Sequence, residues 1–251
     1  MHMGEEKVLL TICGEEKEYE KGTQYLTIAE EYQERYPDDI ILVSVNNKLY
    51  ELHKKAKKGG VLSFVTTADN AGRKTYRRSV TFLMQKALFR LLGKERSPVR
   101  IMHCISQAYY CELAHGEQVD AAFLKRVKEE MLAMADEKMP ILKSSIKTDD
   151  AVELFRDHGM PEKECLFHYR RSSRGSIYSL GNYQDYFYGY MAAHTGYLKY
   201  FDLKPYENGF VLMFPNENTK ETAEFKPSVK HFDTMRRSRE WSRTMGVDTI
   251  G

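Results

Sequence analysis

The chain has 251 residues, more than one average domain contains, so we expect two or more hydrophobic cores. A hydrophobic content of 42% beside 29% charged residues excludes a disordered chain, and no apolar run approaches the roughly 18 residues needed to span a bilayer. The 38 basic and 36 acidic residues give a net charge of +2, so any binding of nucleic acid must depend on local basic patches.

The N-terminus and the cysteines indicate a reducing compartment. The first ten residues include acids and lack the long apolar core of a secretory signal, so we expect a cytoplasmic protein. The cysteines form no CxxC pair, which argues against a disulfide framework and a zinc ribbon. We therefore expect reduced, mostly buried thiols and no metal site. The four cysteines are Cys13, Cys104, Cys111 and Cys165.

The first 70 residues predict a compact β-grasp-like module. Apolar and polar residues alternate in residues 7–19, which predicts a hairpin. A helix is expected within residues 22–37, because glycine precedes its apolar positions and proline follows them. Two strands around an Asn46-Asn47 turn and a last strand in residues 61–69 complete a ββαβββ-like order.

The residues that follow predict a second domain, so the fold class is α+β. Apolar residues at helical spacing predict a helix from Tyr76 to Gly93 and a longer one from Asp120 to Pro140. Several strands are expected around and after these helices, including the segment LFHYRR at 166–171. Residues 216–251 predict a polar linker and a last helix.

The stretches KGTQYLTIAEEY, VNNKLYEL and KKGGVLSFVTTADNAGRKTYRRS follow one another along the chain. Together they resemble a TGS domain that runs into the editing domain of threonyl- and alanyl-tRNA synthetases, and the resemblance covers nearly the whole chain. The family pattern H-S-x-x-H-L-L is matched by Arg78-Ser79-Val80-Thr81-Phe82-Leu83-Met84. The pattern D-L-C-x-G-x-H is matched by Asp185-Tyr186-Phe187-Tyr188-Gly189-Tyr190-Met191.

The substituted patterns are similar to those of uridine kinase-like nucleoside kinases. The resemblance implies a TGS domain in residues 1–70, an editing-like domain in 76–215, and a linker and helix in 216–251 that lead to a kinase domain. No G-x-x-x-x-G-K-[ST] occurs in this chain, so ATP binding and transferase activity are implied only for a longer protein. We expect no cofactor for the 251 residues.

The resemblance also implies that the hydrolytic chemistry has been lost. An editing hydrolase needs a base or a metal-activated water, which histidine and cysteine supply and Arg, Phe and Met do not. Two interpretations stay open: the site still binds a ligand, or the aromatic residues of YFYGYM only pack the core. The candidate ligand-binding residues of this relic site are Arg78, Phe82, Phe187, Tyr188, Met191 and His194.

Two basic features favour an anionic partner. Arg78 follows Arg77 near the expected helix start at Tyr76, where cations oppose the helix dipole. The run from His168 to Gly175 combines hydroxyls with guanidiniums, a composition suited to phosphate or the RNA backbone. A solvated loop explains this run equally well. Its candidate contact residues are Arg170, Arg171 and Arg174.

Three functions stay open at this point. The first is a non-catalytic regulatory or binding region for a nucleotide, an amino acid or RNA, next to a kinase domain and away from any membrane. The second is an aminoacyl-ester hydrolase without metal, in which Arg78, Tyr188 or His194 positions water. The third is an assembly module with Trp241 as its interface anchor. The sequence leaves the oligomeric state open.

Overall fold

The computed structural model describes residues 6–93, 99–105, 107–114, 119–216, 220–222, 224–226 and 229–246. Helices and strands alternate irregularly along the chain, and the sheets are largely antiparallel, which confirms the predicted α+β class. The chain divides into two compact units, Met1–Pro98 with Glu129–Lys199 and Val99–Lys128 with Tyr200–Gly251. The predicted domain boundaries at residues 70, 76 and 216 stay a prediction, because this division follows spatial contacts rather than sequence order.

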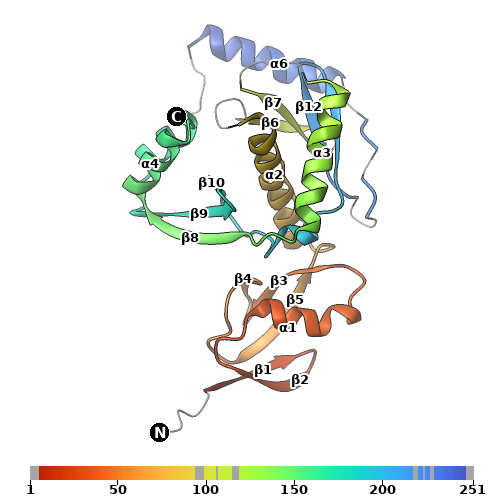
Figure 1. Cartoon of the computed structure of the whole chain (residues 1–251), viewed down its shortest axis with the longest axis vertical. Helices are drawn as coiled ribbons and strands as arrows, with labels where there is room; N and C mark the ends of the chain where they lie inside the picture. Colours follow the sequence, from red (N-terminus) through yellow and green to blue (C-terminus); the bar gives the residue numbers. More distant parts are fainter. Residues whose placement is uncertain are drawn as a thin grey trace. The chain divides into compact units, whose positions relative to one another are not determined.

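The first unit contains a five-stranded sheet in the order β2-β1-β5-β3-β4 (Figure 1). Its strands are β1 (Lys7–Ile12), β2 (Glu15–Glu20), β3 (Ile40–Val45), β4 (Lys48–Glu51) and β5 (Gly60–Thr66). Helix α1 (Tyr25–Tyr32) and the short helix η1 (Gln33–Arg35) connect β2 to β3, and α1 buries Ile28 and Ala29 in the same core as the sheet. The predicted hairpin, helix and later strands are confirmed, and β1 pairs with β5 in parallel as in a β-grasp sheet.

Helix α2 (Asn70–Leu92) follows β5 and is buried along its middle, from Ser79 to Leu88. The helix begins at Asn70 rather than at Tyr76, so its predicted start was wrong. Asp69 directly precedes it in an extended conformation, and Asp is a favoured residue at that position. The predicted end of the helix at Gly93 is confirmed, because Gly93 adopts a positive φ and its N–H donates to the carbonyl of Phe89.

A three-stranded antiparallel sheet in the order β10-β9-β8 completes the first unit. It consists of β8 (Leu142–Lys147), β9 (Arg174–Leu180) and β10 (Tyr183–Tyr186). Helices α4 (Thr148–Asp157) and α5 (Pro161–His168) connect β8 to β9, and the short helix η2 (Thr195–Tyr197) follows β10. The strand predicted at 166–171 was wrong, because Pro161 and two acids in the first turn start a helix that reaches His168.

The second unit is built on a sheet in the order β11-β12-β7-β6. Its strands are β6 (Val99–Ile105), β7 (Ala108–Leu113), β11 (Asp202–Tyr206) and β12 (Gly209–Met213). The predicted last helix is confirmed as α6 (Val229–Thr244), and its Phe232 ring lies edge-on to Tyr110, with the ring centroids 5.3 Å apart. The long predicted helix is α3 (Ala121–Asp136), which crosses the division between the two units.

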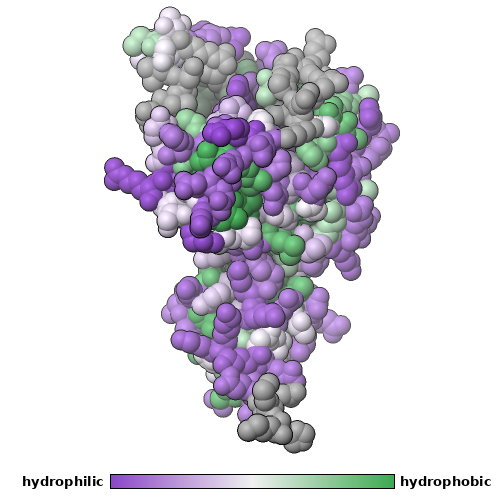
Figure 2. All heavy atoms as spheres, turned by 60° about the vertical axis from the view of Figure 1, so that its left-hand side comes forward, coloured by the Kyte–Doolittle hydropathy of each residue, from purple (hydrophilic) through white to green (hydrophobic). Residues whose placement is uncertain are grey.

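Hydrophilic side chains cover most of the surface drawn in Figure 2, and hydrophobic ones reach it in separate groups. Within the described residues, no helix has the length and apolar character needed to cross a membrane. Only Cys111 is buried among the cysteines, whereas Cys13, Cys104 and Cys165 are exposed. The expectation of mostly buried thiols was therefore wrong.

Candidate functional site

The relic site is formed where α2 meets the segment that follows β10. Ser79 on α2 contacts this segment: its Oγ accepts from the N–H of Ala192 at 2.9 Å and lies 3.8 Å from the sulfur of Met191. On the same helix, Phe82 packs edge-on against Phe187, with the ring centroids 5.4 Å apart. The structure therefore brings together residues that lie more than a hundred positions apart in the sequence.

The apolar members of the relic site are packed like core residues. The side chains of Phe82 and Met191 are 0% exposed, and Phe82 also contacts the ring of Tyr183 at 5.7 Å. Phe187 is partly buried. An aromatic ring and a thioether at these positions offer neither a base nor a good ligand for a hard metal ion.

Arg78 turns toward the protein rather than toward bulk water. Its Nε donates to the carbonyl of Tyr190 at 3.0 Å, and its Nη2 lies 3.4 Å from the hydroxyl of Thr75. Gly189 packs directly on the guanidinium, since a Cβ at Gly189 would lie 2.7 Å from Cζ of Arg78. Because α2 begins at Asn70, Arg78 lies more than two turns inside the helix, and the expected conflict with the dipole at the helix start was wrong.

The other two candidate residues of the relic site lie in different surroundings. Tyr188 is 86% exposed. His194 stacks on Tyr197 with the ring centroids 4.6 Å apart, and its Nδ1 accepts from the N–H of Gly196 at 3.1 Å. Burial, helped by the charge of Lys138, lowers the pKa of His194 and keeps the ring neutral. Because Nδ1 is already an acceptor, Nε2 carries the proton, and the ring has no free basic nitrogen.

A buried carboxylate, which the sequence alone did not indicate, lies beside the relic site. Glu51 at the end of β4 is 2% exposed, and its Oε1 accepts from the N–H of Met191 at 3.0 Å and from the hydroxyl of Tyr178 at 2.6 Å. Its Oε2 lies 3.3 Å from Nζ of Lys143. The same Tyr178 hydroxyl lies 2.6 Å from the carbonyl of Gly189, so its one proton serves two acceptors. Burial and the Glu51 charge raise the pKa of Tyr178, which therefore stays protonated.

Asp185 is a second buried carboxylate that was not among the predicted site residues. It is 0% exposed, and its Oδ1 forms an ion pair with Lys163 and accepts from the N–H of Tyr186 at 2.6 Å. Its Oδ2 is buried and has no hydrogen-bond partner in the part of the chain that the structure describes. An unsatisfied buried carboxylate oxygen is rare and calls for a donor such as water, a hydroxyl or an amine. Asp185 stands unchanged in the motif quoted above, which is the signal that could have pointed to it.

The described residues contain no group of three or more His, Cys, Asp or Glu side chains placed to hold a metal ion. The prediction that this region takes no metal and no cofactor stays a prediction.

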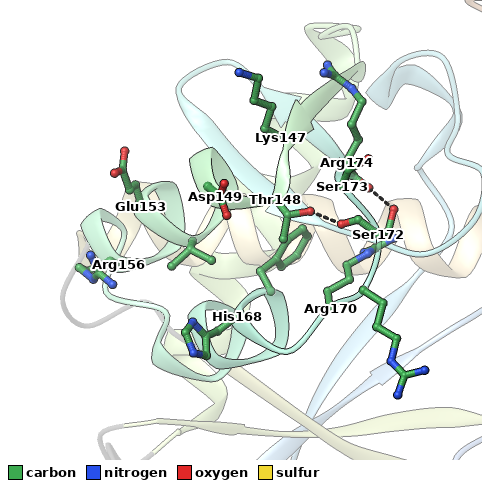
Figure 3. A pocket seen from close by; sticks show the side chains of 13 residues that line it. Lys147, Thr148, Asp149, Glu153, Arg156, His168, Arg170, Ser172, Ser173 and Arg174 are labelled. Atoms are coloured by element: carbon green, nitrogen blue, oxygen red, sulfur yellow. Dashed lines mark hydrogen bonds between the residues drawn. The ribbon is translucent and has the colours of Figure 1, made fainter.

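The predicted basic run borders a surface hollow of about 770 Å³ (Figure 3). The basic hollow is lined by residues of α4, the end of α5 and the loop that leads into β9. The structure places Arg170, Arg171 and Arg174 together on its rim. The other residues that line the basic hollow are Lys147, Thr148, Asp149, Val152, Glu153, Arg156, Phe167, His168, Ser172 and Ser173.

The three arginines of the basic run have different surroundings. Arg174 donates from Nε to the hydroxyl of Ser145 at 2.9 Å. Arg170 lies over two aromatic rings, with its Cζ 5.3 Å from the centroid of Phe167 and 5.1 Å from that of Tyr186. Arg171 is exposed and has no partner among the described residues. Arg171 is therefore the arginine most available to an external anion.

Fold and site together define the class: an α+β region with a β-grasp sheet, in which α2 and the segment after β10 bring the relic-site residues together. Over 192 residues the chain is 30% identical to a threonine–tRNA ligase of Thermotoga neapolitana. The aligned residues cover 76% of this chain and 29% of that protein. It is 27% identical over 190 residues to a threonine–tRNA ligase of Carboxydothermus hydrogenoformans. This alignment covers 75% of this chain and 30% of that protein. The chain therefore contains a threonyl-tRNA synthetase-like region.

A third relative, a threonine–tRNA ligase of Parabacteroides distasonis, is 26% identical over 184 residues, which cover 73% of this chain and 28% of that protein. The chain thus spans about three tenths of the length of the curated relatives that it matches. No protein-family profile matches the chain. The relationship to uridine kinases stays a prediction, because these relatives are all ligases.

Proposed function

We propose that this region is a non-catalytic binding unit, related to the editing region of threonine–tRNA ligases, that recognises RNA or a nucleotide. The observation that carries the proposal is a contrast between two places in one compact unit. Phe82 and Met191, which the sequence resemblance aligns with hydrolytic histidines, are buried, whereas an open hollow elsewhere in the unit is lined by several cations, of which Lys147 and Arg171 have no partner in the described residues.

The loss of catalysis follows from the chemistry of the side chains. Ester hydrolysis needs a group that takes a proton from water, and a good general base lies within hydrogen-bond reach of that water. Arg78 stays protonated and is hydrogen-bonded to a carbonyl, and the acceptor nitrogen of His194 is occupied by a backbone N–H. The replaced positions therefore supply no base.

The ligand class follows from charge and from the relatives. The names of the relatives include threonine and tRNA, so an amino acid and RNA are both natural candidates. The cationic lining of the basic hollow favours the phosphate-bearing candidates, RNA and nucleotides, over an uncharged or zwitterionic ligand.

Two measurements on the purified chain test this function. We expect no release of the amino acid from threonyl-tRNA or seryl-tRNA above the rate without protein. We also expect a thermal shift with RNA or a nucleotide, because a ligand that binds the folded state stabilises it by mass action. Threonine serves as the comparison ligand. Hydrolysis that depends on protein concentration, or the absence of any shift with phosphate-bearing ligands, would contradict the proposal.

A second candidate function, metal-independent hydrolysis of aminoacyl esters, is favoured by one observation. Asp185 keeps an unpartnered, buried Oδ2 in the segment that carries Phe187 and Met191, and a carboxylate can act as a general base. If this function is correct, the wild-type protein deacylates tRNA and Asp185→Asn abolishes the activity while Glu162→Gln, an exposed acid on α5, does not. If all three proteins show only the background rate, hydrolysis is excluded and binding remains as the proposed function.

The wider setting of this region rests on the sequence resemblance. That it precedes and regulates an ATP-dependent uridine kinase domain stays a prediction, as do its cytoplasmic location and the role of Trp241 in assembly. Trp241 is 65% exposed on α6.

A further inference from the structure

The basic hollow carries an inference about the ligand that rests on the proposed function. We propose that it binds single-stranded RNA, with the phosphates on the β8–β9 side and an exposed base stacked at Tyr169.

Two cations face each other at the end of the β8–β9 pair. Lys147 is directly opposite Arg174 in the antiparallel register, and Figure 3 shows both side chains extending in the same direction. Like charges directly opposite each other destabilise a strand pair. Arg174 makes hydrogen bonds to Ser145, but neither cation has an acidic partner among the described residues. A phosphate between the two side chains would remove this repulsion.

Hydrogen-bond donors without partners in the described residues lie in the loop that leads to Arg174. Arg171 and the hydroxyl of Ser173 have no partner in the described part of the chain. The hydroxyls of Thr148 and Ser172 donate to the carbonyls of Ser172 and Arg174, which holds the loop against the start of α4. A fixed loop with an unpaired guanidinium and a free hydroxyl suits the oxygens of a phosphate.

The charges on the rim divide into two sides. Asp149 and Glu153 lie on the α4 side in Figure 3, and Arg156 on that helix is paired with Glu164 at 2.8 Å. Carboxylates repel a phosphate but accept hydrogen bonds from hydroxyl and amino groups. The α4 side therefore suits ribose hydroxyls and bases, and the opposite side suits phosphates. This division favours a polynucleotide over inorganic phosphate, and a volume of about 770 Å³ has room for more than one nucleotide group.

Two exposed aromatic side chains, His168 and Tyr169, directly precede Arg170 in the chain, and His168 lines the basic hollow. Tyr169 is 78% exposed, and its ring stands edge-on to that of His168, with the centroids 5.1 Å apart. Burial of this apolar ring surface would be favourable, and unpaired bases stack on such rings. In duplex RNA the bases are stacked on one another and are not free to do so. The aromatic pair therefore indicates a single strand.

The test uses the full chain and a fluorescein-labelled single-stranded RNA, with the same RNA as a duplex and inorganic phosphate as further probes. The double variant Lys147→Ala/Arg171→Ala removes two cations that have no partner in the described residues, so the fold should stay intact. Lys57→Ala/Lys58→Ala removes the same charge from an exposed site on the β-grasp module and serves as the matched control.

We expect the hollow variant to bind the single strand at least tenfold more weakly, and the control to stay within about twofold of wild type. The slope of log K against log salt should fall by about 1.4 for the hollow variant, because each phosphate contact on a single strand contributes about 0.7. Tyr169→Ala should weaken binding about tenfold without changing the salt slope, and Tyr169→Phe should restore it.

The other outcomes are distinguishable. If wild type binds the RNA and the hollow variant behaves like the control, the hollow is not the site, although the proposed function stands. Equal binding of the duplex with no effect of Tyr169→Ala would overturn the single-strand assignment. A thermal shift with inorganic phosphate at micromolar concentration, without binding of the RNA, would make the hollow a small-anion site. No binding of RNA or any nucleotide would overturn both this inference and the proposed function.

Discussion

The relic site and the basic hollow belong to the same compact unit, yet their polar and apolar groups are arranged in opposite ways. In the relic site, Phe82 and Met191 are completely buried, and Arg78 is hydrogen-bonded to a backbone carbonyl. In the basic hollow, Lys147 and Arg171 are exposed and without partners in the described residues. The first arrangement stabilises the protein, and the second leaves charge available to a ligand.

This difference indicates which of the two places is expected to bind a ligand. Phe82 and Met191 stabilise the fold through their burial, so they are expected to act as part of the core. Unpaired surface cations gain little for stability, so a cluster of them around a hollow is better explained by binding. Substitutions in the relic site should therefore change the free energy of unfolding, and those in the hollow should change binding.

The largest effect is expected for Phe82→Ala. The side chain is 0% exposed and contacts two other rings, so its removal should lower the free energy of unfolding by about 3–5 kcal/mol. Tyr188→Ala, at an 86% exposed position of the same site, should stay within about 0.5 kcal/mol of wild type. Urea denaturation measures both. A cost below about 1 kcal/mol for Phe82→Ala would mean that the ring lines a ligand site rather than the core.

A smaller loss is expected for Glu51→Gln, which keeps the shape of the side chain and removes its charge. The amide has one acceptor oxygen where the carboxylate has two, so either Lys143 or the pair formed by Tyr178 and Met191 loses its acceptor. A buried polar group left without its partner costs about 1–3 kcal/mol, again measured by urea denaturation. The exposed Glu16→Gln in β2 is the control. Equal stability of the two variants would show that the Glu51 network is not strained by the change.

Much of the fold follows from patterns that a single sequence displays. The alternation around Leu10 and the spacing around Ile28 predict β1 and α1, because burial on one face dictates both periods. The error at 166–171 arose because Leu166 and Phe167 together with Tyr169 have a strand-like composition. The stronger signal was the helix start at Pro161, which decided the structure.

The site was less predictable, for a physical reason. Glu51 and Tyr178 are 127 residues apart, and no local pattern indicates that their side chains meet. The basic run from His168 was visible in the sequence, but a hollow depends on how α4 and β9 are placed by the rest of the unit. Charge can be counted in a sequence, whereas the absence of a partner can be established only in a structure.

The pH dependence of stability should reflect two partly buried histidines, His53 and His194. Burial lowers the pKa of His53 and of His194 below 6.5, so near that pH the unfolded chain binds more protons than the folded one. The stabilisation is therefore complete above pH 6.5 and is lost as the pH falls toward the lowered values. The slope should not exceed about 1.4 kcal/mol per pH unit for each histidine. Urea denaturation between pH 5 and 8 measures the slope, and His194→Gln should reduce it.

The smallest effect, and the one with opposite sign, is expected for Lys147→Glu. Replacement of one member of the Lys147–Arg174 pair turns a cross-strand repulsion into an attraction, so the free energy of unfolding should rise by about 0.2–1 kcal/mol. The gain should shrink in high salt, which screens charges at the surface. Lys204→Glu in β11 is the control, because the residue opposite Lys204 is the uncharged Val211. RNA binding should weaken for Lys147→Glu and not for Lys204→Glu. A variant that is both more stable and a weaker binder would show that the repulsion serves the ligand, whereas an unchanged or lower stability would mean that the two cations do not repel each other in the free protein.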